Sequence, residues 1–364
     1  MLPSVERLSI QQTVVDYDTP YLSGLRSMTT AKGARLLRTL DLATHDHSPE
    51  LMIKVPSQAP AVLELAQGTL QTLKLHMCNG FWSAPEDAPT FRSLKTLRLT
   101  QSHLSAAELG VLLSCCTGGL TSFTYEAASA RSTFSKSQFH PSEAIESLSS
   151  HRLTLKALHL DLRPVFDSLS MQPMPPASLA DFTALEDLFL SVNTLWRKDQ
   201  AFPADEAEGA RLLTGLLPAS TTSLCITGPD VDRRLRRLPA ELLGLARAVA
   251  SGGQPARLRH VRCDSRLKRR FDKGLGPEFG SIFRAAGVDF GFSSWPLSRT
   301  TVAREDVPEP LRVEWGGPSY AFDGSDPEER EYEEAERQEV EREEAERMGR
   351  EPADPRLTLA FVCW

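Results

Sequence analysis

Residues 185–195 read Leu-Glu-Asp-Leu-Phe-Leu-Ser-Val-Asn-Thr-Leu, and the first six contain an apolar pattern, L-x-x-L-x-L, that occurs about nine times along the chain. The first residues of successive copies are separated by 32, 33, 24, 26, 35, 30, 36 and 37 residues. A repeat near this period is typical of solenoid proteins, in which each unit packs on its neighbours. The copies are Val5/Leu8/Ile10, Leu37/Leu40/Leu42, Leu70/Leu73/Leu75, Leu94/Leu97/Leu99, Leu120/Phe123/Tyr125, Leu155/Leu158/Leu160, Leu185/Leu188/Leu190, Thr221/Leu224/Ile226 and Leu258/Val261/Cys263.

The spacing within each copy predicts a short β-strand. Its second and third apolar residues lie two positions apart, as side chains on one face of a strand do. The segments between copies often carry helix signals: a capping box formed by Ser105 and Glu108, and helical apolar spacing in residues 205–217 and 239–250. Alternating strands and helices of this kind predict an α/β fold with a parallel sheet and helices on one side.

The pattern resembles that of the leucine-rich-repeat family. Residues 185–195 match the longer consensus L-x-x-L-x-L-x-x-N/C-x-L completely, residues 94–104 match it with Ser102 in the asparagine place, and Cys78 occupies that place in the third copy. The resemblance implies a leucine-rich-repeat solenoid of about nine or ten irregular repeats, with a curved parallel sheet and helices on its convex side. The alternative, chance leucine spacing in an ordinary α/β protein, would have to account for nine copies.

The irregular repeat lengths are similar to those of divergent fungal-type F-box/leucine-rich-repeat proteins. Residues 279–292 look like the closing unit of that group, in which a helix leads into a final strand, expected here at residues 288–292. The F-box that precedes the repeats in that group is not expected in this chain, because Val5 already belongs to the first predicted strand. The resemblance implies a substrate-recruiting subunit of a ubiquitin ligase, in a longer or partnered form that contacts a cullin-adaptor protein.

Composition divides the chain into four parts. We predict a leucine-rich-repeat domain over residues 1–295, a Pro/Gly linker over 296–325, an acidic Glu/Arg-rich helix over 326–350 and an apolar C-terminal tail over 351–364 that docks on the repeats. The acidic helix carries a net charge of -7, which equals the net charge of the whole chain. The rest of the chain is therefore formally neutral, and this disfavours a nucleic-acid partner.

A basic region covers residues 233–273, where the net charge is +10. One interpretation is nuclear import or contact with phosphate groups. The other is a solvated flank or pairing with the acidic helix within the same chain. An acidic segment after the repeats also leaves open an alternative function, that of a GTPase-regulator-like or nuclear acidic-tailed leucine-rich-repeat scaffold.

The predicted binding surface is the concave face of the solenoid. The residue between the second and third apolar positions of each copy points there: Ser9, Asp41, Lys74, Arg98, Thr124, His159, Phe189, Cys225 and Arg262. With flanking positions included, the predicted partner-binding residues are Lys74, His76, Arg98, Glu126, His159, Asp161, Phe189 and Arg262. Lys74, His76 and Arg98 would form a basic step, and Phe189 an exposed aromatic anchor. We expect a protein or peptide partner; the alternative is a polar, solvated face without one.

The motifs of common enzymes do not occur in the sequence: H-E-x-x-H, G-x-S-x-G and G-x-x-x-x-G-K-[ST] are all missing. Residues 274–280 superficially resemble a dinucleotide-binding loop, but the third glycine comes one residue late and the preceding segment is highly charged. Histidines and cysteines do not combine at zinc-ligand spacing. We therefore expect a non-enzymatic protein without a cofactor or metal.

The six cysteines show no disulfide framework, and we expect free thiols, with the vicinal pair Cys115-Cys116 as the alternative of a redox site. The N-terminus has no basic and apolar segments of a secretory signal, and no apolar run approaches a membrane span. These features predict a cytoplasmic or nuclear protein without membrane contact.

Overall fold

The computed structural model describes residues 6–12, 36–44, 60–78, 80, 82, 86, 88–128, 140–162, 178–192, 212–228, 238–268 and 279–295. The chain divides into two units, Met1–Thr301 and Val302–Trp364, and every described residue belongs to the first. The predicted linker, acidic helix and apolar tail lie outside the described residues and stay predictions. Among the described helices, none is long and apolar enough to cross a membrane.

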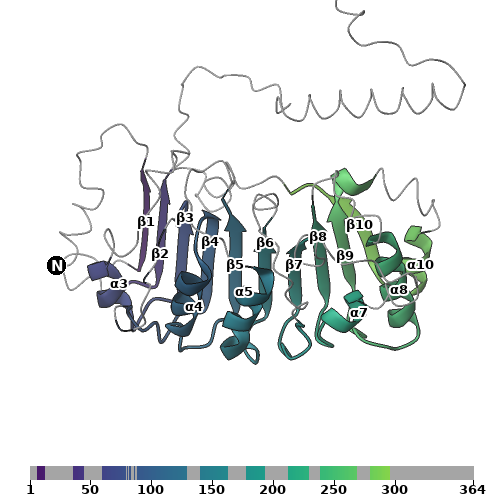
Figure 1. The fold of residues 1–364 in the computed structure, drawn as a ribbon, viewed down its shortest axis with the longest axis horizontal. Helices are drawn as coiled ribbons and strands as arrows, with labels where there is room; N and C mark the ends of the chain where they lie inside the picture. Colours follow the sequence, from purple (N-terminus) through teal and green to yellow (C-terminus); the bar gives the residue numbers. More distant parts are fainter. Residues whose placement is uncertain are drawn as a thin grey trace, which may run out of the picture. The chain divides into compact units, whose positions relative to one another are not determined.

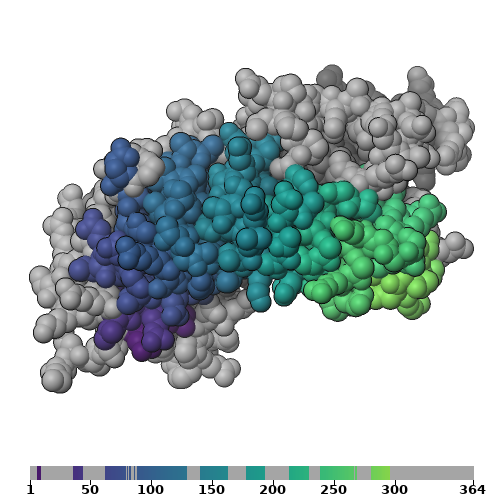
Figure 2. All heavy atoms as spheres, turned by 90° about the horizontal axis from the view of Figure 1, so that it is seen from below, coloured from purple at the N-terminus to yellow at the C-terminus, as the bar shows by residue number. Residues whose placement is uncertain are grey.

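The described strands form one open, ten-stranded sheet in which each strand pairs in parallel with its neighbours in sequence (Figure 1). The strands are β1 (Arg7–Gln12), β2 (Thr39–Thr44), β3 (Thr72–His76), β4 (Thr96–Ser102), β5 (Ser122–Ala127), β6 (Ala157–Asp161), β7 (Asp187–Ser191), β8 (Ser223–Thr227), β9 (His260–Asp264) and β10 (Asp289–Ser293). β1 to β9 coincide with the nine predicted copies, and β10 begins one residue after the start predicted for the closing strand. Figure 2 shows successive repeats side by side in sequence order.

The helices lie on one face of this sheet (Figure 1). They are α3 (Pro60–Ala66), α4 (Ala106–Ser114), α5 (Pro141–Ser147), α7 (Leu212–Leu216), α8 (Leu238–Ala250) and α10 (Phe279–Ala285), with 3-10 turns η4 (Leu148–His151) and η8 (Ser265–Leu267). Helices of neighbouring repeats pack on each other, as α4 does on α5 and α8 on α10. The predicted α/β leucine-rich-repeat solenoid is confirmed. We call the sheet face away from the helices the strand face.

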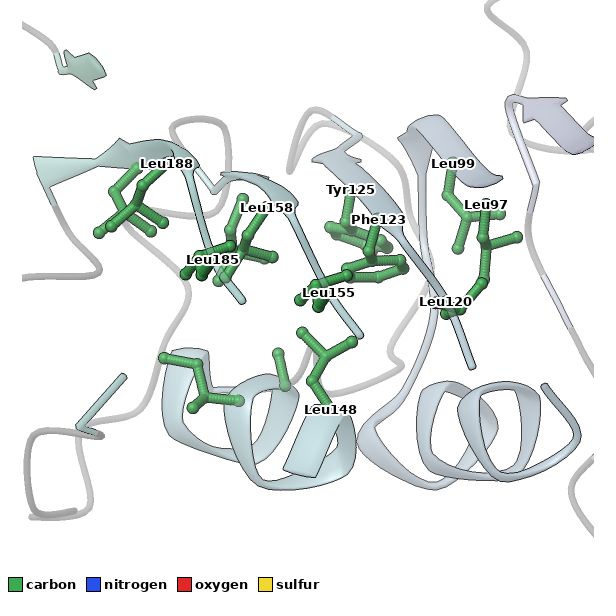
Figure 3. Packing of buried hydrophobic residues seen from close by; sticks show 14 of the residues in the cluster. Leu97, Leu99, Leu120, Phe123, Tyr125, Leu148, Leu155, Leu158, Leu185 and Leu188 are labelled. Carbon is green, nitrogen blue, oxygen red and sulfur yellow. The ribbon is translucent and has the colours of Figure 1, made fainter. Parts of the chain in front are cut away.

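The apolar positions of the repeats fill the space between sheet and helices. Figure 3 shows Leu97, Leu99, Phe123 and Leu158 pointing from their strands toward the helices. Each is at most 2 % exposed. Full burial of such a side chain stabilises the fold by about 1.5–3 kcal/mol, and no single repeat could achieve it alone.

A polar side chain just before the first apolar position ties each of several repeats to the one before it. Thr69 Oγ1 donates to the Leu37 carbonyl at 3.0 Å, and Thr154 Oγ1 donates to the Leu120 carbonyl at 2.8 Å. Ser220 Oγ makes the same bond to the Leu185 carbonyl at 2.7 Å. This hydroxyl position is a second repeat signal, which the apolar pattern alone does not reveal.

The N-terminus of α4 and the C-terminus of α8 confirm two of the predicted helix signals. Ser105 Oγ accepts from the backbone N–H of Glu108, whose carboxylate accepts from the Ser105 N–H at 2.9 Å, so the predicted capping box opens α4. The helix predicted over residues 239–250 is α8, and Gly252 follows it with a φ of +76°, where glycine is strongly preferred. Of the helix predicted over 205–217, residues 205–211 lie outside the described part, and α7 occupies Leu212–Leu216.

The turns after β3 and β4 are joined through the predicted asparagine-like positions. Ser102 Oγ accepts from the Cys78 N–H at 3.2 Å and donates to the Thr100 carbonyl at 3.0 Å. The buried Cys78 thiol donates to the Gly80 carbonyl at 3.5 Å. Tyr125 adds a further link, because its hydroxyl donates to the Ser102 carbonyl at 2.9 Å.

His151 is a buried histidine that fastens α4 to the next repeat. The ring is 3 % exposed, its Nε2 lies 3.1 Å from the Leu113 carbonyl, and its Nδ1 lies 3.4 Å from the Leu120 N–H. An Nε2–H donor and an Nδ1 acceptor satisfy both contacts, so the neutral ring fits this position. Burial lowers the pKa of His151 from its ordinary value of 6.5.

We therefore expect stability to fall at mildly acidic pH. A histidine with a lowered folded-state pKa binds protons more readily in the unfolded chain, so its contribution is complete above about pH 6.5 and is lost as the pH falls through the folded-state pKa. Urea unfolding of wild type and of His151→Gln between pH 7.5 and 5 should show a smaller loss of unfolding free energy in the variant. Parallel pH dependence of the two proteins would contradict this role.

Candidate functional site

The middle positions of the ten strands form one row across the strand face. Strand pairing places them in register in the order Ser9, Asp41, Lys74, Arg98, Thr124, His159, Phe189, Cys225, Arg262 and Gly291. The first nine are the side chains expected on the concave face. We call this set the middle row. Neighbouring members are about 4.8 Å apart, the spacing of strands in a sheet.

Two cationic side chains are adjacent in the middle row. Lys74 on β3 and Arg98 on β4 are register partners, and both are half-buried. The Nε atom of Arg98 is buried and has no hydrogen-bond partner within the described part of the chain. A buried donor of this kind usually has an acceptor, and a partner bound at Arg98 would supply one.

His76 does not belong to this basic step, and the expectation that it faces solvent is wrong. Its side chain is 6 % exposed, and its Nδ1 lies 2.8 Å from Thr100 Oγ1 on the neighbouring strand. Of the three residues of the predicted basic step, Lys74 and Arg98 are therefore the two that are partly exposed.

The expectation that Glu126 and Asp161 lie on the binding surface is also wrong. Glu126 and Asp161 are register partners at the ends of β5 and β6, but they are only 6 % and 1 % exposed. Hydrogen bonds link neighbouring strands and turns near these strand ends: the Leu162 N–H donates to Ser191 Oγ at 3.0 Å, and Thr227 Oγ1 donates to Asp264 at 2.8 Å. The alternation of side chains along a strand correctly predicts the face of the sheet on which these residues lie. It does not show that packing covers the ends of the strands.

Phe189 lies in the middle row as expected, but it is not an exposed anchor. It is 9 % exposed, because His159 stacks on its ring at a centroid distance of 3.8 Å and an interplanar angle of 12°. Trp295 contacts the same ring at 5.4 Å with an angle of 88°. His159 also has its Nε2 3.8 Å from Glu126 Oε1. We call His159, Phe189 and Trp295 the aromatic cluster.

Sequence reasoning missed Trp295, which stands at the last position of the predicted repeat domain. The available signal was a large aromatic residue two positions after the closing strand, at the point where a linker was expected. No periodicity connects it to Phe189, because the contact depends on the path of the chain after β10.

Arg262 is engaged within the protein. Its guanidinium donates to the Asp289 carbonyl at 2.8 Å and also pairs with the Asp289 carboxylate on β10. The hydrogen bond from Arg262 is the main reason that the pKa of Asp289 is lowered, and His260 adds a smaller contribution. The predicted partner-binding role of Arg262 would therefore require a partner to compete with Asp289.

The described residues do not assemble a reactive centre of the types considered. No group of three or more His, Cys, Asp or Glu side chains among them could hold a metal ion. The adjacent thiols of Cys115 and Cys116 are both buried, and burial raises the pKa of each. Because the thiolate is the reactive form, this environment does not favour a redox pair.

Comparisons with known proteins add little. No protein family and no curated protein matches the sequence. One solved structure with a similar fold is an internalin from Listeria monocytogenes, at 12 % identity over 80 % of this chain and 88 % of that chain, with a TM-score of 0.25. A similarity this low supports no functional argument, and the assignment of the fold rests on the ten parallel strands themselves.

Proposed function

We propose that this protein is a non-enzymatic recognition module that binds a protein partner on the strand face around Arg98. Repeat solenoids of this kind present extended binding surfaces. The observation that carries the proposal is the buried Nε atom of Arg98, which lies in the middle row without an acceptor among the described residues.

The chemistry of Arg98 indicates what the partner presents. A guanidinium offers a rigid fork of donors that matches a carboxylate, and charge-assisted bonds of this type are the stronger ones in proteins. Lys74 adds a second positive charge on the adjacent strand. The expected partner therefore places an aspartate or glutamate side chain over β3 and β4.

The test is affinity purification from the native cells with wild type and Arg98→Glu, followed by mass spectrometry. One charge-assisted bond contributes about 1.5–3 kcal/mol, so the partner should be recovered at least about tenfold less with the variant. Arg152→Glu is the matched control, because Arg152 is an exposed arginine between η4 and β6. Arg98→Met, which keeps much of the side-chain volume, should also lose the partner. Equal recovery with all four proteins would refute the proposal.

A finer form of the proposal is that the module recruits substrates to a ubiquitin ligase, as the resemblance to F-box/leucine-rich-repeat proteins implies. This role would place the protein in the cytoplasm or the nucleus. The support is the irregular repeat lengths and the closing unit quoted above. The same purification tests it: recovery of a cullin-adaptor protein with wild type is expected, and its absence from a sample that contains other partners would exclude this role.

A further inference from the structure

Trp295 contacts a strand that is remote from its own place in the sheet. It follows β10 by two residues, yet its ring lies against Phe189 on β7, three strands away. Three strand spacings amount to about 14 Å. The segment after β10 therefore turns back over the strand face, and Figure 1 shows it running from β10 toward β7.

The ring that Trp295 covers belongs to the strand face and not to the leucine core. Leu188 and Leu190 on either side of Phe189 point to the helices, so Phe189 points the other way. His159 occupies one face of its ring and Trp295 meets it edge to face. Aromatic residues bind rings in these geometries, and another aromatic side chain could take the place of Trp295.

We propose that His159 and Phe189 form a receptor for an aromatic side chain, that Trp295 occupies it in the free protein, and that the partner is an extended peptide whose aromatic residue replaces Trp295. This inference rests on the proposed function, since the same peptide places its carboxylate at Arg98. Trp295 thus acts as an internal competitor for the partner.

The positions of the two contacts determine the spacing of the peptide motif. Arg98 on β4 and Phe189 on β7 are separated by three strands, about 14 Å, along the middle row. An extended chain advances about 3.3 Å per residue, so this distance corresponds to four residues. Residues four apart in an extended peptide also point to the same side, which lets both side chains face the sheet. The motif is an acidic and an aromatic residue at positions i and i+4.

The experiment measures the binding of two fluorescently labelled synthetic peptides, Asp-Ser-Gly-Ser-Trp and Trp-Ser-Gly-Ser-Asp, to the full chain by anisotropy. The two sequences cover both directions across the sheet. Removal of the competitor in Trp295→Ala should tighten binding of one peptide about three- to tenfold, the range that one aromatic pair supplies. Trp295→Phe keeps a ring in the receptor and should bind closer to wild type. Arg98→Met should weaken binding of the same peptide at least about tenfold.

The outcomes separate this inference from the proposed function. Equal affinity of wild type and Trp295→Ala, or no binding of either peptide to either protein, would overturn the receptor. In that case, a partner that is still lost with Arg98→Glu in the purification would leave the proposed function standing. If the peptide binds Trp295→Ala more tightly than wild type but binds Arg98→Met with wild-type affinity, the link between the receptor and Arg98 would be overturned. Should Trp295→Ala melt below the assay temperature, Trp295→Leu is the replacement.

Discussion

Replacing Phe123 with alanine is expected to lower the free energy of unfolding by about 3–5 kcal/mol, the usual effect of removing a phenyl group from a core. Phe123 lies on β5, is fully buried, and is among the largest buried side chains of the described repeats. Its register partners are Leu97 on β4 and Leu158 on β6 (Figure 3). Alanine would leave a cavity in the middle of three consecutive repeats.

The consequence should extend beyond one repeat, because each unit of a solenoid is stabilised mainly by its neighbours. Urea unfolding followed by circular dichroism measures the effect. The matched control is Thr124→Ala, the next residue on the same strand, which is half-buried on the strand face and should change the stability by less than about 1 kcal/mol. Similar unfolding midpoints for the two variants would show that the Phe123 side chain does not couple neighbouring repeats.

Most of the fold can be predicted from the sequence because its signals are local. Two apolar residues at a separation of two predict a strand wherever the copy occurs, and all nine copies lie on strands. Ser105 with Glu108 predicts the start of α4 for the same reason, since the capping box spans only four residues. The role of the Thr154 hydroxyl is not predictable in this way, because its acceptor lies in the preceding repeat.

The sequence predicts which residues lie in the candidate site but not which of them are exposed, because position on a strand and exposure have different causes. Alternation correctly assigns Arg98, His159 and Phe189 to the middle row. Exposure depends on what covers the row, and the contact between Phe189 and Trp295 joins residues more than one hundred positions apart. His76 is also buried, although the repeat pattern places it beside Thr100 on the neighbouring strand. The contact between Phe189 and Trp295 leaves no periodic trace in the sequence.

A second large effect is expected from Gly118→Ala, in the turn between α4 and β5. A Cβ atom at Gly118 would lie 2.0 Å from the carbonyl oxygen of Arg92 and 2.7 Å from its carbonyl carbon. Both atoms are backbone, so no side chain can swing away to relieve the overlap. The Phe91 carbonyl also accepts from the Gly118 N–H at 3.4 Å, which holds the two turns together. We expect a loss of at least about 3 kcal/mol, at the upper end of the usual cost of overpacking.

Gly68→Ala is the matched control, because Gly68 precedes Leu70 by two residues as Gly118 precedes Leu120. A Cβ atom at Gly68 would meet nothing within 4 Å, so its substitution should change stability by no more than about 0.5 kcal/mol. The comparison separates steric contact between repeats from any general need for glycine at this turn position. Thermal and urea unfolding of the two variants would decide it: equal losses would assign the effect to backbone conformation, and an unchanged Gly118→Ala protein would mean that the two turns separate at little cost.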